Sequence, residues 1–223
     1  GFYENNNICV LIKINSETDF AAKSDKFLDF LDNIGNFAVS IKDEININDF
    51  LNLTYNQKKI SDHFNEIISV IGENIILGDL KVINHDDSFF NYYVHNAYRA
   101  NIGKIISLVV YSSKIKDSKI DELSKNLCMH IAALRPDAMD INSLDKEYIE
   151  KEKKFQIENI KSSGKPDNII EKILEGKMNK FYEESTLLNQ KYVLDTDKSV
   201  KQVISELPKD YLFKLINYTL VVL

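Results

Sequence analysis

The sequence predicts an α+β fold, with two small antiparallel sheets packed against helices and an antiparallel helical hairpin inserted into the chain. Apolar residues recur at helical spacing in several long stretches, while β-rich runs separated by turn residues occupy 75–112. Two further stretches, 145–161 and 166–190, are dense in Lys and Glu and carry only narrow apolar seams. Such seams are typical of the paired helices of a coiled-coil hairpin.

The first subdomain is expected to begin with a strand. Residues 8–14 read Ile-Cys-Val-Leu-Ile-Lys-Ile, a nearly continuous apolar run that is typical of a central strand. Helices are expected over 18–40, as a short element within 42–56, and over 58–72. Ser16 and Thr18 are both good N-caps for the first of these helices, and Gly72 is placed as the C-cap of the last.

The rest of the core adds β-rich runs and another long helix. The runs are 75–84, 89–98 and 102–112, and together with the first strand they predict a three- or four-stranded antiparallel sheet. A helix over 117–134 should end at Arg135-Pro136, because the residue before proline disfavours α geometry. A short helix is expected over 200–207, and the apolar run 211–223 is expected to pair with a strand at 138–141 in a second sheet.

The two charged stretches predict a hairpin that stands out from the body, because each narrow seam can be buried by the partner helix alone. Ser162-Ser163-Gly164-Lys165 would be its tight connector. The predicted organisation is a first core subdomain, a second core subdomain in two parts, and the hairpin inserted between those parts. The corresponding segments are 1–112, 113–145 with 191–223, and 146–190.

Composition argues against several functional classes. The 223 residues carry a formal net charge of −6, and no block of five or six like charges occurs, so direct nucleic-acid binding is not expected. No apolar run approaches the ~20 residues that a membrane span requires. Cys9 and Cys128 lie far apart and form no Cys-x-x-Cys motif, which fits reduced thiols in a cytoplasmic protein.

No motif for catalysis or for a cofactor is present. The sequence lacks the glycine-rich patterns that bind phosphate, and its four histidines do not have the spacing of zinc ligands. We therefore expect no catalytic residue, no metal and no cofactor, and a protein that is not an enzyme. His130 lies in an apolar helical stretch, where a buried histidine with satisfied hydrogen bonds is a better interpretation than a ligand.

The segment Thr18-Asp19-Phe20 has two possible interpretations. It can be simply the start of a capped helix, with its acidic groups at the positive end of the helix dipole. Phe20, however, lies in the first turn with the polar neighbours Lys23 and Ser24 at helical spacing. Its ring would either tuck under another element or project towards a partner, and the residue types alone leave both open.

Residues 12–23, Ile-Lys-Ile-Asn-Ser-Glu-Thr-Asp-Phe-Ala-Ala-Lys, resemble the signature of bacterial elongation factor Ts. Further blocks that agree with the family, in the same order, are 71–75, 129–133, 163–166 and 175–181. The resemblance implies a guanine-nucleotide exchange factor of translation elongation. Such a factor binds the GDP form of elongation factor Tu and promotes GDP release by disturbing the Mg²⁺ and phosphate site.

The resemblance also implies roles for particular residues. Asp19 and Phe20, with Thr18 before them, match the exchange-promoting segment, and the positions supporting that contact are Ile71, Gly72 and His95. In this sequence Tyr98-Arg99 looks inserted relative to the family pattern, close to His95. The family has a small N-terminal helical domain that we expect to be missing here, since residue 1 is Gly rather than Met and strand 8–14 follows at once.

Other functions remain open at this stage. The hairpin can serve dimerisation, so a homodimer is possible. The main alternative to nucleotide exchange is a non-catalytic scaffold that uses the hairpin for protein–protein interaction. A third alternative is a hydrolase whose nucleophilic site is assembled from residues that are distant in the sequence. A GDP-release assay with elongation factor Tu separates exchange from both.

Overall fold

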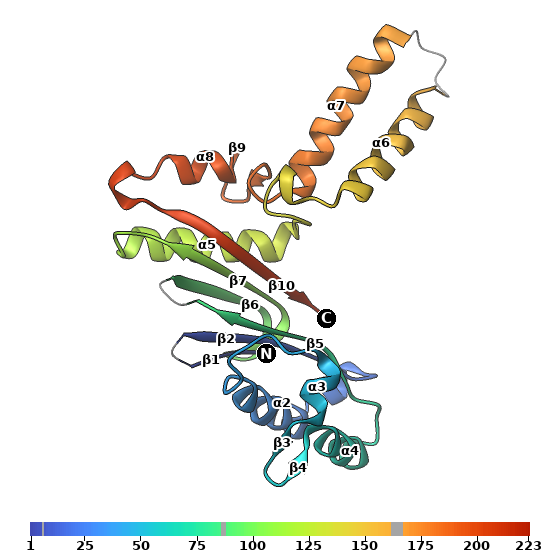
Figure 1. Ribbon diagram of the computed structural model, residues 1–223, viewed down its shortest axis with the longest axis vertical. Helices are drawn as coiled ribbons and strands as arrows, with labels where there is room; N and C mark the ends of the chain where they lie inside the picture. Colours follow the sequence, from blue (N-terminus) through green and yellow to red (C-terminus); the bar gives the residue numbers. More distant parts are fainter. Residues whose placement is uncertain (6, 86–87, 162–166) are drawn as a thin grey trace.

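The computed structural model describes residues 1–5, 7–85, 88–161 and 167–223, and it has the predicted α+β class (Figure 1). Two three-stranded antiparallel sheets lie face to face between helices. The first has the order β1-β2-β5, with β1 at Phe2–Asn5, β2 at Ile8–Asn15 and β5 at Ile76–Asn84. The second has the order β10-β7-β6, with β10 at Lys214–Val222, β7 at Ile102–Ser112 and β6 at Phe89–Arg99.

Strand β2 is central, as its apolar run predicts, because both of its faces are covered. Val10 and Ile12 point towards the helices below the first sheet, whereas Cys9 and Leu11 point into the layer between the two sheets. The helices on this side are α1 (Asp19–Ala22), α2 (Asp25–Ala38), α3 (Ile47–Asn52) and α4 (Ile60–Ile71). A small hairpin of β3 (Thr54–Tyr55) and β4 (Lys58–Lys59) lies between α3 and α4.

The second sheet is buried on both faces for the same reason. On β7, Leu108 faces the first sheet, while Val109 faces helix α5 (Ser118–Leu134) on the outer side. Ser107 also points outward, and its hydroxyl donates to the Cys128 carbonyl of α5 at 2.6 Å. The fold is therefore a stack of helices, sheet, sheet and helix (Figure 1).

Two predictions of strand pairing are wrong. The runs 89–98 and 102–112 do not join the first strand; they form β6 and β7, which belong to the sheet of β10. Strand β10 pairs with β7, with Tyr218 opposite Val109, and not with 138–141. That segment has an isolated bridge from Ala138 to Thr186, followed by a 3-10 helix, Ile141–Ser143. The division of the chain into domains stays a prediction.

The helix expected over 18–40 is two helices. Ser24 interrupts it and accepts a hydrogen bond from the Phe27 backbone N–H at 3.3 Å, so it caps α2 separately from α1. Serine side chains compete well for backbone N–H groups, which favours such a break. The later predicted helices are confirmed with small shifts of their ends, except that the helix expected over 166–190 already ends at Ser185.

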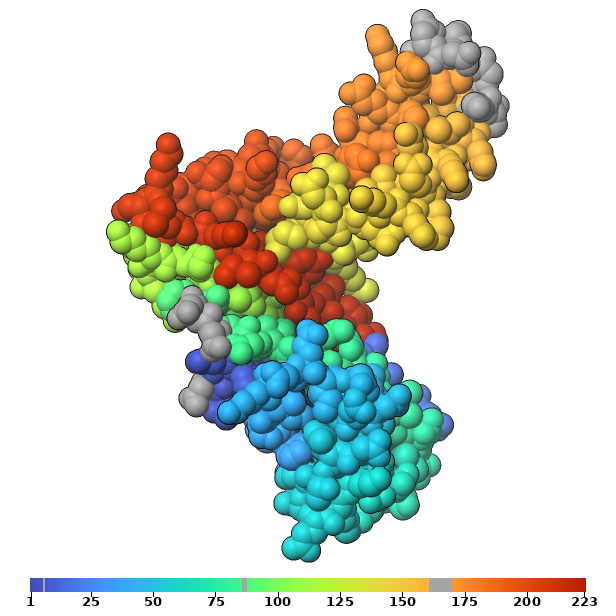
Figure 2. Space-filling model, in the orientation of Figure 1, coloured from blue at the N-terminus to red at the C-terminus, as the bar shows by residue number. Residues whose placement is uncertain are grey.

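The hairpin consists of α6 (Lys146–Lys161) and α7 (Asp167–Ser185), and it projects from the body (Figures 1 and 2). Tyr148 and Phe181 pack edge to face across it, with ring centroids 5.3 Å apart. The predicted connector 162–165 lies outside the described residues. At the base, the Asp137 N–H donates to the Ser185 carbonyl at 2.8 Å and the Leu187 N–H donates to the Ala138 carbonyl at 2.9 Å, so entry and exit lie side by side.

The chain beyond the hairpin returns to the second sheet. It forms β8 (Lys191–Tyr192), β9 (Asp195–Ser199), α8 (Val200–Ser205) and a 3-10 helix at Lys209–Tyr211 before β10. Strands β1, β3, β4, β8 and β9 were not predicted from the sequence. Among the described residues, no helix combines the length and apolar character that crossing a membrane requires.

His130 is a buried core residue, as its apolar surroundings predict. Its Nδ1 accepts from the Val193 N–H at 3.2 Å, and its Nε2 lies 3.0 Å from the Gln190 Oε1. These contacts place the proton on Nε2, so the ring is neutral in the folded protein. Burial lowers the pKa of His130 below its ordinary value of 6.5, against the opposite effect of the Gln190 hydrogen bond.

The free energy of unfolding is expected to decrease as the pH falls below about 6.5, because the unfolded chain then takes up a proton that folded His130 resists. At pH 5.5 this contribution reaches up to about 1.4 kcal/mol. Urea unfolding at pH 7.5 and 5.5 measures it. His130→Gln should show a smaller pH dependence than wild type, whereas His95→Gln, which alters an exposed ring, should keep it. Equal dependence in wild type and His130→Gln would contradict this assignment.

Candidate functional site

Phe20 projects into solvent. Its side chain is 88% exposed, the largest fraction among the exposed large apolar residues that the structure describes. It belongs to α1, which is a single turn whose N-cap is Thr18; the Thr18 Oγ1 accepts from the Ala21 N–H at 3.2 Å. Of the two arrangements that the sequence left open, the ring therefore adopts the outward one.

Glu73 joins this turn to the end of helix α4. Its two carboxylate oxygens accept from the Thr18 backbone N–H at 3.0 Å and from the Thr18 hydroxyl at 2.7 Å. Glu73 follows Gly72, which ends α4 in the left-handed conformation, with φ of 82°, that glycine adopts without steric strain. The structure thus joins Thr18, at the start of the turn that carries Asp19 and Phe20, to Glu73, the residue after Gly72.

Two more exposed apolar side chains lie near this junction. Val70 and Ile76, on either side of Gly72-Glu73, are 55% and 50% exposed. Ile71, to which the resemblance gave a role in the contact, is instead half-buried and packs against the apolar core between the first sheet and its helices. We call Phe20, Val70 and Ile76 the Phe20 surface. Sequence reasoning missed Val70 and Ile76, although Val70 lies off the apolar stripe of α4 and this offset was a usable signal.

Asp19 is held by a cation from the other sheet. Lys104, on β7, donates to both carboxylate oxygens of Asp19 at 3.0 and 2.9 Å. The hydrogen bond from Lys104 lowers the pKa of the Asp19 carboxyl, so the pair stays charged at neutral pH. Asp19 and Lys104 also line a cleft of about 340 Å³ between α1 and the ends of the two sheets. Sequence reasoning did not find Lys104, because no pattern of residues distinguishes it from other surface lysines.

His95 occupies a different face. It lies on β6 opposite Ile105 of β7, and its Nδ1 is 3.2 Å from the Tyr93 hydroxyl. Because side chains alternate along a strand, His95 shares the face of β7 that carries Ile105 and Ser107, which is the α5 side. Lys104 points to the opposite face. The structure therefore joins the turn of Thr18, Asp19 and Phe20 to the end of α4. His95 lies on the opposite face of the second sheet from Lys104, the residue that binds Asp19.

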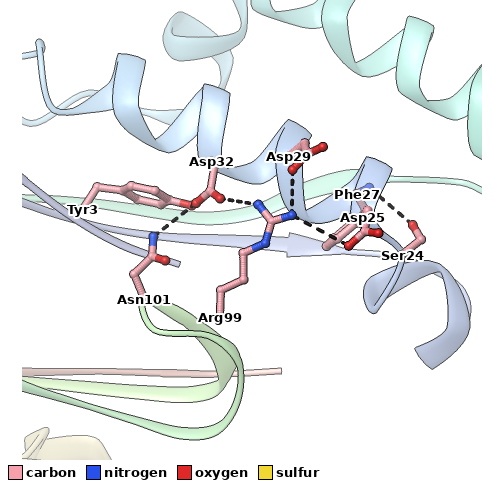
Figure 3. Close-up of polar contacts among 8 residues, drawn as sticks. All are labelled: Tyr3, Ser24, Asp25, Phe27, Asp29, Asp32, Arg99 and Asn101. Carbon is pink, nitrogen blue, oxygen red and sulfur yellow. Dashed lines mark hydrogen bonds and ion pairs between the residues drawn. The ribbon is translucent and has the colours of Figure 1, made fainter.

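A second polar network lies beside α1 and joins the tip of the β6–β7 hairpin to α2 (Figure 3). The Arg99 guanidinium contacts Asp29 at 2.6 Å and Asp32 at 2.5 Å, and Asp25 lies 4.0 Å away. Asp32 also accepts from the Tyr3 hydroxyl at 2.9 Å and from the Asn101 amide at 3.2 Å. The α2 helix is thus tied to the second sheet.

This region presents an exposed apolar ring beside paired charges. In the described part of the chain, no group of three or more His, Cys, Asp or Glu side chains is arranged to hold a metal ion. Two carboxylates at this turn already have partners, since Asp19 binds Lys104 and Glu73 binds Thr18. A large apolar ring held on a fixed turn can insert into a partner, and its neighbours define the orientation of that contact.

Comparison with known proteins identifies the family of the chain. The sequence model of the family described as "Elongation factor TS" matches residues 17–222. Elongation factor Ts of Rickettsia bellii is 37% identical over 202 residues, covering 90% of this chain and 65% of the relative. Elongation factor Ts of Allorhizobium ampelinum is 34% identical over 210 residues, covering 94% of this chain and 68% of the relative.

The match extends from Glu17 to Val222, so it includes the second sheet, strand β5 of the first sheet, the hairpin and the Phe20 surface, whereas β1 and β2 precede it. The chain spans 65% of the length of the Rickettsia bellii relative. The family assignment rests on this continuous match and not on the short segment around Phe20 alone. The chain belongs to the elongation factor Ts family.

Proposed function

We propose that the chain is a guanine-nucleotide exchange factor that acts in the cytoplasm on the GDP form of elongation factor Tu. The observation that carries this proposal is the exposed ring of Phe20 on a turn anchored on two sides. In the proposed complex, Phe20 inserts into the nucleotide domain, and Asp19 lies beside the region that holds Mg²⁺ and phosphate. GDP then leaves because those contacts loosen, and no covalent bond changes.

The energetics require more than one contact. A factor that weakens GDP binding is itself bound more weakly by the same ratio when GDP is present. A ~10⁴-fold loss of nucleotide affinity corresponds to about 5.5 kcal/mol of differential binding. Burial of one phenyl ring contributes about 1.5–3 kcal/mol. We propose that Val70 and Ile76, exposed apolar side chains that flank Gly72-Glu73, extend the contact.

A release assay tests the proposal directly. Elongation factor Tu loaded with a fluorescent GDP analogue is mixed with excess unlabelled GDP, with and without the chain. We expect release to accelerate with increasing concentration of the chain and to reach a plateau. If saturating chain left the release rate unchanged, the exchange function would be rejected.

The alternative is a scaffold that uses the hairpin to bind another protein or a second copy. It is favoured by two exposed aromatic side chains on α6, Phe155 and Tyr148, which are 57% and 42% exposed. The hairpin projects from the body, so these side chains are available to a partner. A scaffold would bind a partner through the hairpin and would leave GDP release unchanged. The release assay therefore distinguishes the two functions.

A further inference from the structure

The segment that carries Phe20 is held by the tip of the β6–β7 hairpin, which belongs to the other sheet. Lys104 binds both oxygens of Asp19 on α1. The Lys23 ammonium, at the end of α1, lies 5.8 Å from the centroid of the Tyr98 ring. Arg99 binds carboxylates of α2. We call these three hairpin residues, Tyr98, Arg99 and Lys104, the clamp.

Helix α1 needs such support. It has four residues. A single helical turn is not stable on its own, because its few hydrogen bonds do not offset the backbone conformational entropy that is lost when the turn forms. Its only buried residue is Ala21, so core packing fixes the turn weakly. The direction of Phe20 therefore depends on its two anchors, Thr18 with Glu73 on one side and Asp19 with Lys104 on the other.

Helix α2 needs the clamp for an electrostatic reason. Asp25, Asp29 and Asp32 repeat at helical spacing and line one face, where like charges repel one another. Arg99 lies among them, and its side chain is only 29% exposed. The planar guanidinium binds two of these carboxylates with separate nitrogens, which fixes its orientation in a way that a point charge does not.

The hairpin tip has a defined shape. The register shifts between Ala97 and Arg99, and Asn96 before them has a φ of 50°. Gly103 lies against the opposite strand, where an added Cβ would be 2.6 Å from the Val94 Cγ1 and 2.8 Å from the His95 carbonyl oxygen. These features fix the backbone of the hairpin tip, from which Lys104 reaches α1 and Arg99 reaches α2.

We propose that Lys104 and Arg99 are positioning residues, which hold the segment 19–32 against the second sheet and so set the direction in which Phe20 is presented. The clamp connects the partner-binding turn to the sheet that carries the rest of the body. Only the consequence for exchange rests on the proposed function; the mechanical role of the clamp does not.

The test uses a tryptophan reporter in place of the Phe20 ring, because the sequence contains no tryptophan. In a Phe20→Trp background, time-resolved fluorescence anisotropy reports nanosecond motion of the turn. We expect Lys104→Ala and Arg99→Ala to raise the amplitude of that motion about twofold. Lys104→Arg, which keeps the charge, should restore order. Lys198→Ala is the matched control, because Lys198 binds two carboxylates and is similarly exposed but lies on β9, outside the segment 19–32 and the clamp.

A second readout connects the clamp to exchange. With Phe20 intact, Lys104→Ala should weaken the apparent affinity for elongation factor Tu about fivefold, since a less ordered turn loses more freedom on binding. Lys104→Gln repeats the test with a polar side chain, and circular dichroism checks that the variants fold.

The two readouts fail separately. If the indole of the Phe20→Trp chain were equally ordered with and without the side chains of Lys104 and Arg99, the proposed positioning role of these residues would be rejected, whatever the exchange activity. If the wild-type chain did not accelerate GDP release, the proposed function would fail, and the anisotropy of the indole reporter would still decide the clamp.

Discussion

Phe20→Ala is expected to lower the acceleration of GDP release by about 10- to 100-fold, because the lost burial of one ring is worth about 1.5–3 kcal/mol. The free energy of unfolding should not change, since the ring is 88% exposed in the free protein and so contributes little to core packing. The measurement is release of fluorescent GDP from elongation factor Tu over a range of factor concentrations. Circular dichroism and urea unfolding of the variant should match those of wild type.

The matched control is Phe155→Ala. Phe155 is also an exposed phenylalanine, 57% accessible, but it lies on α6 of the hairpin. We expect this variant to exchange nucleotide at nearly the wild-type rate. A larger loss in Phe155→Ala than in Phe20→Ala would move the partner contact to the hairpin. Equal activity in Phe20→Ala and wild type would remove the ring from the mechanism.

Gly35→Ala is expected to destabilise the fold by about 1–3 kcal/mol, the usual effect of forcing an extra carbon into a packed core. Gly35 is buried on α2, and an added Cβ would overlap atoms of the Tyr3 ring. That ring cannot move aside freely, because it is buried and its hydroxyl donates to Asp32 at 2.9 Å. Urea unfolding monitored by circular dichroism measures the change.

Gly176→Ala is the control for Gly35→Ala. Gly176 is also helical, in α7, but an added Cβ would meet no atom within 4 Å. Alanine should therefore stabilise that helix by about 0.5–1 kcal/mol. In addition, combining Gly35→Ala with Tyr3→Ala should cost less than the sum of the single changes, because the clash disappears with the ring. Additive effects would show that the ring is not the obstacle.

The element types were largely predictable because they depend on local patterns. The run Ile8 to Ile14 is apolar at nearly every position since both faces of β2 are buried, and this pattern predicted the central strand directly. The choice of strand partners is not local. Strands β6 and β7 have the same propensities as β5, yet they pair with β10, which lies beyond the hairpin in sequence. No periodicity of residues 89–112 carries that information.

The sequence marked Phe20 as unusual but left its direction open, and it did not mark the residues that support its turn. Phe20 drew attention because an aromatic ring with polar helical neighbours is a departure from the usual amphipathic pattern. Glu73, Arg99 and Lys104 are charged residues in a sequence that is 28% charged, so nothing in their spacing separates them from solvated surface groups. Their importance arises only when the fold brings them to Thr18, α2 and Asp19.

The side-by-side entry and exit of the hairpin have an evolutionary consequence. Hydrogen bonds between 137–139 and 185–188 close its base, so the body receives both ends at one place whatever the length of the arm. Whole helical turns can then be gained or lost at the far end with only a slow change in loop-closure entropy. A longer or shorter arm would therefore leave the turn that carries Phe20 unchanged, because the arm joins the body at 137–139 and 185–188.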